Sequence, residues 1–302
     1  MGKNLLDRVE AQPRVEGEVM QRVTSPLRYP GGKAKALGMI LPLVPLSFSE
    51  YREPFLGGGS VFVALKQLRP NAKYRVNDLN QDLYSFWSAV KSNVDEMVRE
   101  IIRIKNRSKN GRALYERLTW AKDVSDDFHR AVRFYILNRI TYSGTVYGGY
   151  SSEAFEKRFT LSNIEKLKPL SNLLQNVEIT NESYENLLSE NGEDVFIYMD
   201  PPYWKSKKSK LYGKNGNLHR SFDHTQLAKS ARKCKHKWLI TFDDSEVIRQ
   251  LFTFANIHPW KMQYGMNNVG KKRARKGKEL FVTNYVIRRD CRCSIGVSNL
   301  TK

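Results

Sequence analysis

The residues best suited to chemistry are Asp200, Pro201, Pro202 and Tyr203, which follow the apolar run VFIYM. Such a run predicts a buried parallel strand, and ligands bind at the carboxyl ends of parallel strands. A carboxylate and a proline carbonyl there can accept hydrogen bonds from both N–H groups of an exocyclic base amine. The ring of Tyr203 can stack on the same base once it has left a duplex. The tetrapeptide therefore predicts a site for chemistry at a nucleobase amine.

A glycine turn earlier in the chain predicts a site for a nucleoside-containing cofactor. The sequence EPFLGGGS places Gly57–Gly59 between a predicted strand and a predicted helix, and glycine lets the backbone approach a ligand closely. Asp78 ends the next predicted strand, where open α/β folds commonly hold a ribose hydroxyl. The dinucleotide fingerprint requires a third glycine where this chain has Phe62, and the carboxylate of Glu53 disfavours a phosphate. These features favour S-adenosylmethionine, with its adenosine, ammonium and sulfonium, over NAD.

The charge of the chain predicts a nucleic-acid partner. There are 51 Lys and Arg residues against 31 Asp and Glu, a formal net charge of +20, and a field of this sign attracts polyanions. Two basic, glycine-containing segments at 204–220 and 270–278 are predicted to be loops that contact phosphates. The candidate DNA-binding residues in them are Lys207, Lys208, Lys271, Lys272 and Arg273.

The cysteines and the hydropathy predict a cytoplasmic protein without a metal site. The three cysteines form no CxxC pair, and the five histidines lack the spacing of metal ligands. A reducing compartment fits this pattern better than a disulfide scaffold does. No apolar run approaches the roughly 18 residues that a membrane span requires.

Alternating strand and helix patterns at both ends of the chain predict an α/β sheet into which a second domain is inserted. Predicted strands lie at 51–55, 73–78, 194–200, 237–244 and 279–289, the last near a sheet edge. Apolar residues recur at helical spacing over 81–106 and 126–142, and 143–160 is expected to be a loop or hairpin. We expect a flexible arm at 1–22, a catalytic domain at 23–81 and 181–290, a mainly helical insertion at 82–180, and a tail at 291–302.

The motifs RYPGGK, EPFLGGGS and DPPY, in this order, make the chain resemble the D12 class of adenine-specific DNA methyltransferases, the Dam-like group. NRITYSG, SFDHTQLA and KGKELFVTNY extend the resemblance, which runs from about residue 25 to 288. It implies a Rossmann-like, seven-stranded and mostly parallel sheet with an inserted target-recognition domain. It also implies methyl transfer from S-adenosylmethionine to adenine N6 in double-stranded DNA.

The resemblance assigns roles to individual positions of this chain. In the family, Asp200 would touch both the cofactor and the target amine, and the acid after the second strand, Asp78, would touch the cofactor. The full set of expected cofactor-binding residues is Tyr29, Lys33, Glu53, Phe55, Gly57, Gly59, Asp78 and Asp200. The segment 145–159 matches a DNA-contacting hairpin, in which Tyr147 or Tyr150 could wedge into the base stack.

Two other classes of function fit the same sequence. One is a methyltransferase that acts on RNA adenine, cytosine N4 or a protein amide, although the N4 and amide enzymes often replace the first Asp of DPPY by Ser or Asn. The other is a non-catalytic nucleic-acid-binding module. A genetic link to a restriction endonuclease is a further hypothesis, and a monomer is the default expectation.

Overall fold

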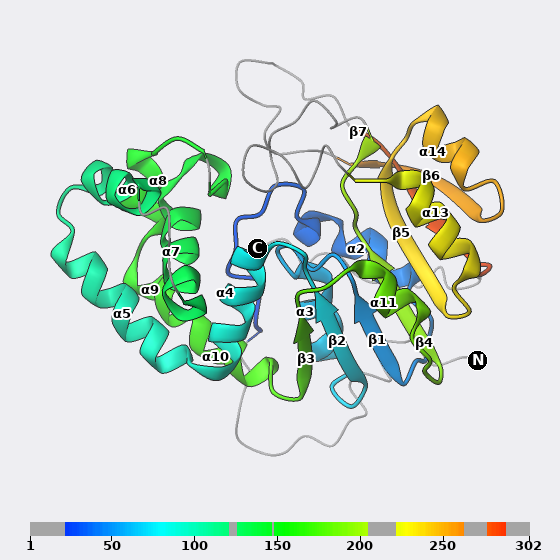
Figure 1. Cartoon of the computed structure of the whole chain (residues 1–302), viewed down its shortest axis with the longest axis horizontal. Helices are drawn as coiled ribbons and strands as arrows, with labels where there is room; N and C mark the ends of the chain where they lie inside the picture. The colour runs from blue at the N-terminus through cyan, green and yellow to red at the C-terminus, as the bar shows by residue number, and fades with distance from the viewer. Residues whose placement is uncertain (1–21, 121–125, 147, 205–221, 263–276, 288–302) are drawn as a thin grey trace, which may run out of the picture.

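A seven-stranded sheet forms the centre of the computed structural model, which describes residues 22–120, 126–146, 148–204, 222–262 and 277–287 (Figure 1). The strand order is β3-β2-β1-β4-β5-β7-β6. β7 runs antiparallel to both neighbours, and the other pairings are parallel. The strands are β1 (Glu50–Glu53), β2 (Lys73–Asn77), β3 (Val177–Thr180), β4 (Val195–Met199), β5 (Lys237–Asp243), β6 (Asn256–Met262) and β7 (Gly277–Thr283). The expected mostly parallel α/β sheet is confirmed.

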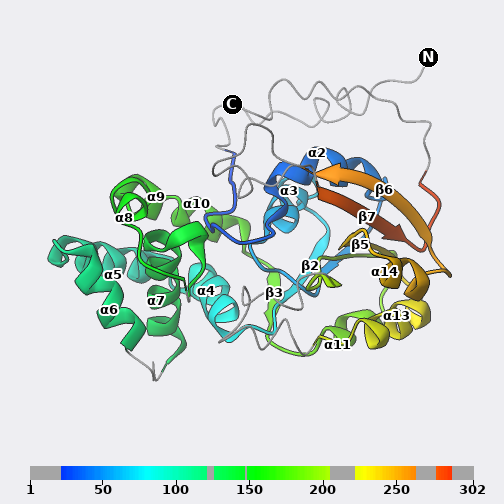
Figure 2. The same ribbon diagram turned by 90° about the horizontal axis from the view of Figure 1, so that it is seen from above.

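Helices cover both faces of the sheet, so the central strands are buried on both sides (Figure 2). On β4, Phe196 and Tyr198 belong to the core on one face, and Ile197 and Met199 to the core on the other, because successive side chains of a strand point in opposite directions. One face carries η1 (Lys33–Ala36), α2 (Leu37–Ile40), η2 (Leu41–Leu43) and α3 (Ser60–Leu68); the other carries α11 (Tyr184–Ser189), α13 (His224–Lys233) and α14 (Glu246–Leu251).

The last predicted strand lies near a sheet edge, as expected: β7 is next to β6, which is the edge strand. The sequence NIHPWKM was not recognised as a strand because Pro259 interrupts it. Proline is tolerated on an edge strand, because its nitrogen, which has no N–H to donate, can face the side without a neighbouring strand.

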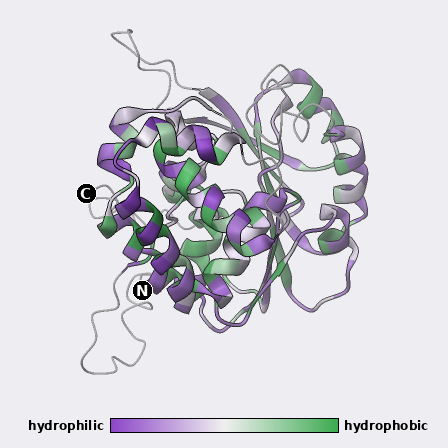
Figure 3. Ribbon diagram, turned by 60° about the vertical axis from the view of Figure 1, so that its left-hand side comes forward, coloured by the Kyte–Doolittle hydropathy of each residue, from purple (hydrophilic) through white to green (hydrophobic). Residues whose placement is uncertain are grey.

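A group of helices lies beside the sheet, beyond β3 (Figures 1 and 2). It contains α4 (Gln81–Ser92), α5 (Val94–Arg107), α6 (Gly111–Trp120), α7 (Asp127–Ile140), α8 (Ser152–Arg158), α9 (Leu161–Glu165) and α10 (Leu167–Leu173). These helices alternate between hydrophobic and hydrophilic residues along the ribbon, as amphipathic helices do (Figure 3). The expected boundary at residue 180 falls too late, because β3 pairs with β2 and belongs to the sheet.

The structure refines two local expectations. The helical spacing over 81–106 belongs to two helices rather than one, because Asn93 ends α4 and precedes α5. The start of the segment 143–160 agrees with the expected loop or hairpin, since the 3-10 turn η3 (Tyr142–Gly144) leads into it and Thr141 and Tyr150 form an antiparallel bridge. From Ser152 the chain is helical, because Ser151 caps α8 by accepting a hydrogen bond from the amide of Ala154 at 3.2 Å. Among the described residues, no helix is long and apolar enough to cross a membrane.

Candidate active site

The predicted motifs meet at a cavity of about 610 Å³ at the carboxyl ends of the parallel strands. Its walls come from the segments 29–33, 53–61, 77–80, 182–185, 198–203 and 222–226. These segments are distant in the sequence, and the sheet brings them together because β1, β2 and β4 are neighbours. This is the edge at which open α/β sheets bind ligands.

The glycine turn has a backbone that only glycine adopts without strain. Gly57 and Gly59 have φ values of +48° and +64°, in the left-handed region. A Cβ at Gly57 would lie 2.8 Å from Cε1 of Tyr29, and one at Gly59 would lie 2.6 Å from Cζ2 of Trp87. The indole of Trp87, which is fully buried, donates to the carbonyl of Gly57 at 3.1 Å. The indole of Trp87 thus holds the turn in place, and the backbone of the turn lines the cavity.

Asp78 connects the end of β2 to this turn. Its carboxylate accepts hydrogen bonds from the amides of Gly57 at 2.7 Å and Asn80 at 2.9 Å. Burial raises the pKa of Asp78 to about 6, although the two amide donors act in the opposite direction. The carboxyl therefore titrates close to neutral pH, at a position from which it can accept a further hydrogen bond from a ligand hydroxyl.

Asp200, at the end of β4, is held by two donors. The ammonium of Lys33 lies 2.6 Å from Oδ2, and the hydroxyl of Thr241 donates to Oδ1 at 2.7 Å. The Lys33 side chain is only 4% exposed; its Nζ also donates to the carbonyl of Gly31 and lies 5.0 Å from the ring centroid of Tyr203. The predicted residues Lys33, Asp200 and Tyr203 thus form one cluster.

Two acidic residues on β5 and β7 support the segment after Asp200. The phenol of Tyr203 donates to Oε2 of Glu279 at 2.7 Å. The amide of Trp204 donates to Oδ1 of Asp243 at 2.9 Å. Glu279 and Asp243 are both buried, so they fix the backbone and ring of the DPPY motif from within the protein. Sequence analysis did not assign a role to Glu279.

Glu53 lies in the cavity wall but is buried at 2% exposure. Burial, followed by the nearby carboxylates of Asp200 and Asp78, raises its pKa well above the usual value, although a hydrogen bond from the hydroxyl of Tyr51 opposes the shift. Burial therefore shifts Glu53 toward its neutral form. The negative charge that the sequence argument attributed to Glu53 is therefore better assigned to less buried carboxylates of the cavity.

The cavity is nevertheless acidic, in contrast to the chain as a whole. Among the described residues that line it, six are acidic and one, Lys33, is basic. The acidic residues are Glu53, Asp78, Glu182, Glu185, Asp200 and Asp223. Even without Glu53, five acidic residues remain against Lys33, so a ligand with positive charge is favoured in this cavity.

An aromatic wall completes the cavity. The ring centroid of Phe55 lies 5.3 Å from that of Tyr184 and 5.6 Å from that of Phe222. All three line the cavity, so a flat heterocycle has apolar surface to contact. Phe55 was predicted from the glycine motif. Phe222 lies within the SFDHTQLA stretch but was given no role, and Tyr184 lies in no quoted motif.

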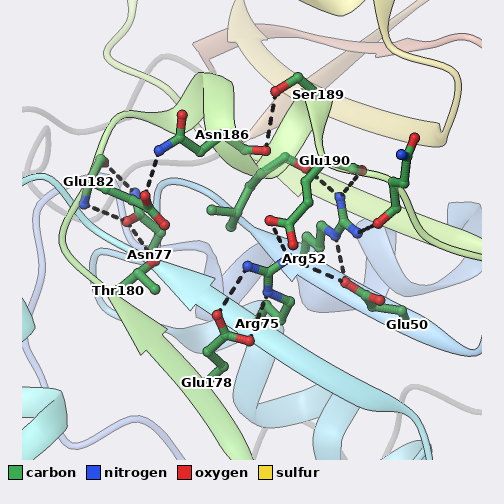
Figure 4. Close-up of polar contacts among 12 residues, drawn as sticks. Glu50, Arg52, Arg75, Asn77, Glu178, Thr180, Glu182, Asn186, Ser189 and Glu190 are labelled. Atoms are coloured by element: carbon green, nitrogen blue, oxygen red, sulfur yellow. Dashed lines mark hydrogen bonds and ion pairs between the residues drawn. The ribbon is translucent and has the colours of Figure 1, made fainter.

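Buried charges connect α11, whose first turn borders the cavity, to the sheet (Figure 4). Arg52 on β1 is fully buried. It donates to Glu50 at 2.6 Å and to the carbonyls of Leu187 and Glu190, at the end of α11, at 2.8 and 2.7 Å. Arg75 on β2 forms an ion pair with the Glu190 carboxylate at 2.6 Å. These contacts fix the helix that carries Tyr184.

The predicted DNA contacts are only partly described. Lys207, Lys208, Lys271, Lys272, Arg273 and Tyr147 lie outside the described residues. Tyr150 packs between Tyr115 and Phe155, with ring centroids 6.2 and 6.4 Å away, and the guanidinium of Arg112 lies 5.3 Å from its ring. The wedge role of Tyr150 stays a prediction. Tyr142, the first residue of η3, follows α7 by two positions and is 64% exposed.

Comparison with known proteins gives a consistent result. Residues 29–266 match the family described as D12 class N6 adenine-specific DNA methyltransferase. The type II methyltransferase M.MjaIII of Methanocaldococcus jannaschii is 26% identical over 289 residues, covering 86% of this chain and 98% of that protein. The DNA adenine methylase of Escherichia coli K12 is 27% identical over 263 residues, covering 82% and 90%.

The solved structure of the rRNA methyltransferase aviRa from Streptomyces viridochromogenes matches 90% of this chain and 94% of that chain, with a TM-score of 0.34 and 11% identity. A likeness this weak bears on neither fold nor substrate. The family match spans most of the chain and includes the glycine turn and the DPPY motif. The chain therefore belongs to the D12 class of N6 adenine-specific DNA methyltransferases.

Proposed function

We propose that the chain transfers a methyl group from S-adenosylmethionine to N6 of an adenine that is flipped out of duplex DNA. Family membership supports methyl transfer to DNA adenine. The observation that carries the finer proposal is the fixed carboxylate of Asp200, held by Lys33 and Thr241 at one end of an acidic cavity that the glycine turn also lines.

The residues of the cavity fit S-adenosylmethionine. Its volume of about 610 Å³ lies within the range of small-molecule sites. The excess of carboxylates favours the ammonium and sulfonium charges, and the carboxylate of Asp78 can accept from a ribose hydroxyl. The rings of Phe55, Tyr184 and Phe222 offer contacts to an adenine. When bound, this cofactor supplies an electrophilic methyl group.

The DPPY motif would orient the target amine. Asp200 accepts from one N–H of the amine, and Lys33 and Thr241 keep its carboxylate in place. The carbonyl of Pro202 already accepts a hydrogen bond from Nε2 of His224 at 2.8 Å, so the carbonyl of Pro201 is the better acceptor for the second N–H. Two fixed acceptors favour the nitrogen geometry that develops as the methyl group is transferred. No general base is required before transfer, because the proton can leave afterwards.

The remaining parts of the protein would bind the DNA. Tyr203, held by Glu279 and lying near Lys33, would stack on the flipped base. We assign target recognition to the helices α4–α10, and we add the exposed Tyr142 to Tyr147 and Tyr150 as candidate wedges. Lysines and arginines of the segments 204–220 and 270–278 would contact phosphates. A monomer, and a genetic link to a restriction endonuclease, remain part of the proposal.

An Asp200→Asn variant tests this assignment. We expect transfer of labelled methyl from S-adenosylmethionine to unmethylated duplex DNA to fall on the order of 10²- to 10³-fold, because the variant loses a charged acceptor at the reacting nitrogen. DNA affinity should stay within about 3-fold of the unchanged chain, since phosphate contacts dominate it. Asp244→Asn is the matched control: Asp244 also follows a strand but pairs with Arg249 and does not line the cavity. Equal activity of Asp200→Asn and Asp244→Asn would contradict the proposal.

A further inference from the structure

The side chain of His224 connects helix α13 to the DPPY motif. It is the first residue of α13, and Asp223 caps the helix by accepting from the amides of Thr225 and Gln226 at 2.8 and 3.0 Å. The imidazole is 2% exposed, and its Nε2 lies 2.8 Å from the carbonyl oxygen of Pro202. A carbonyl oxygen can only accept, so Nε2 carries the proton of this hydrogen bond.

Aromatic rings hold the imidazole in this orientation. Trp204 and Phe222 meet it edge-on, with ring centroids 5.2 and 4.9 Å away and interplanar angles of 77° and 85°. Phe242 on β5 lies 6.1 Å away. Because Trp204 follows the DPPY motif and Phe222 lines the cavity, His224 contacts both the catalytic motif and the cavity wall.

The proline ring of Pro202 carries this restraint to the preceding carbonyl. Proline locks φ near −65°. The angle between the peptide planes before and after Pro202 therefore depends only on the ψ angle of Pro202. A hydrogen bond that fixes the carbonyl of Pro202 fixes this ψ. It thereby fixes the direction of the Pro201 carbonyl on one side and of the Tyr203 backbone on the other.

We propose that His224 is a positioning residue for methyl transfer: its Nε2–H sets, through the Pro202 carbonyl, the direction of the Pro201 acceptor and of Tyr203. This inference rests on the proposed function, in which the Pro201 carbonyl accepts from the target amine. His224 itself touches neither the amine nor the cofactor.

Two variants separate the hydrogen bond from the packing of the ring. His224→Phe keeps an aromatic ring against Trp204 and Phe222 but cannot donate, whereas His224→Gln loses the ring but keeps an N–H at a similar reach. For methylation of duplex DNA we expect His224→Phe to lower kcat by on the order of 10- to 100-fold, because a small displacement of an orienting group has effects of this size. KM for DNA and Kd for S-adenosylmethionine should stay within about 3-fold, and His224→Gln should retain kcat within about 3-fold.

The outcomes distinguish this inference from the proposed function. Full kcat in His224→Phe, or equal losses in both variants, would overturn the positioning role. A loss in His224→Phe that appears in KM or in cofactor Kd, with kcat unchanged, would also overturn it and indicate a packing role. If the unchanged chain transfers no methyl to DNA although it binds the cofactor, the proposed function fails, and the inference fails with it.

Discussion

The glycine turn gives a prediction whose size follows from the structure. In Gly59→Ala, a residue with a side chain must adopt φ of +64°, which costs about 1–2 kcal/mol for an L-residue. Its Cβ would lie 2.6 and 2.8 Å from Cζ2 and Cη2 of Trp87. The indole is fully buried and bonded to Gly57, so it cannot move aside freely, and overpacking of this kind costs about 1–3 kcal/mol.

The two contributions together predict a loss of about 2–5 kcal/mol in the free energy of unfolding. For a chain of this size that lowers Tm by about 2 °C per kcal/mol, or about 4–10 °C in total. Thermal melting followed by circular dichroism, with urea unfolding as a second measure, would detect it. The matched control is Gly38→Ala on α2: Gly38 is exposed and nothing lies within 4 Å of its Cβ position.

Gly38→Ala should leave Tm unchanged or raise it, because alanine is favoured over glycine in a helix by up to about 1 kcal/mol. If Gly59→Ala melts within about 1 °C of the unchanged chain, the turn can relax around the new methyl group. The argument that this backbone requires glycine would then be refuted.

Three further predictions concern the cavity. Because the pKa of Asp78 is about 6 and a ribose hydroxyl would bind its charged form, affinity for S-adenosylmethionine should rise as pH increases from about 5 to 7 and then level off. In calorimetry, Asp78→Asn should remove this pH dependence. An equal pH dependence in the variant would contradict the role of Asp78. Because burial favours neutral Glu53, Glu53→Gln should change the free energy of urea unfolding by less than about 1 kcal/mol, and a loss above about 2 kcal/mol would show that the charged form is needed. Tyr203→Ala should raise KM for DNA about 10- to 100-fold through lost stacking, whereas Tyr203→Phe should change it by less than about 3-fold; equal effects would argue against stacking.

The sequence predicted the parts of the fold that local pattern controls. Continuous apolar runs marked β4 and β5, and Asp78 after β2 and Asp200 after β4 marked the edge of the sheet where the cavity lies. The strand β6 escaped because Pro259 breaks its pattern, and its edge position, which tolerates the proline, is a property of the whole sheet. The break at Asn93 likewise depends on how α4 and α5 pack.

The candidate site was predictable in its residue types but not in its pairings. Lys33 was assigned to the cofactor only by resemblance, and its contact with Asp200 joins residues 167 positions apart. The contacts of Tyr203 with Glu279 and of Pro202 with His224 also depend on strand order and helix placement. The protonation of Glu53 could not be inferred from its type, since it follows from complete burial beside other carboxylates.

The central proposal is that the chain transfers a methyl group from S-adenosylmethionine, bound in the acidic cavity, to adenine N6 in duplex DNA, with the target amine oriented by the fixed Asp200 carboxylate. The most direct measurement is to incubate the unchanged chain with labelled S-adenosylmethionine and unmethylated duplex DNA, and to identify the labelled nucleoside after digestion. The account predicts N6-methyladenine as the labelled product, at a defined sequence when the same DNA is sequenced. Label in N4-methylcytosine, or label that enters only RNA under the same conditions, would contradict it.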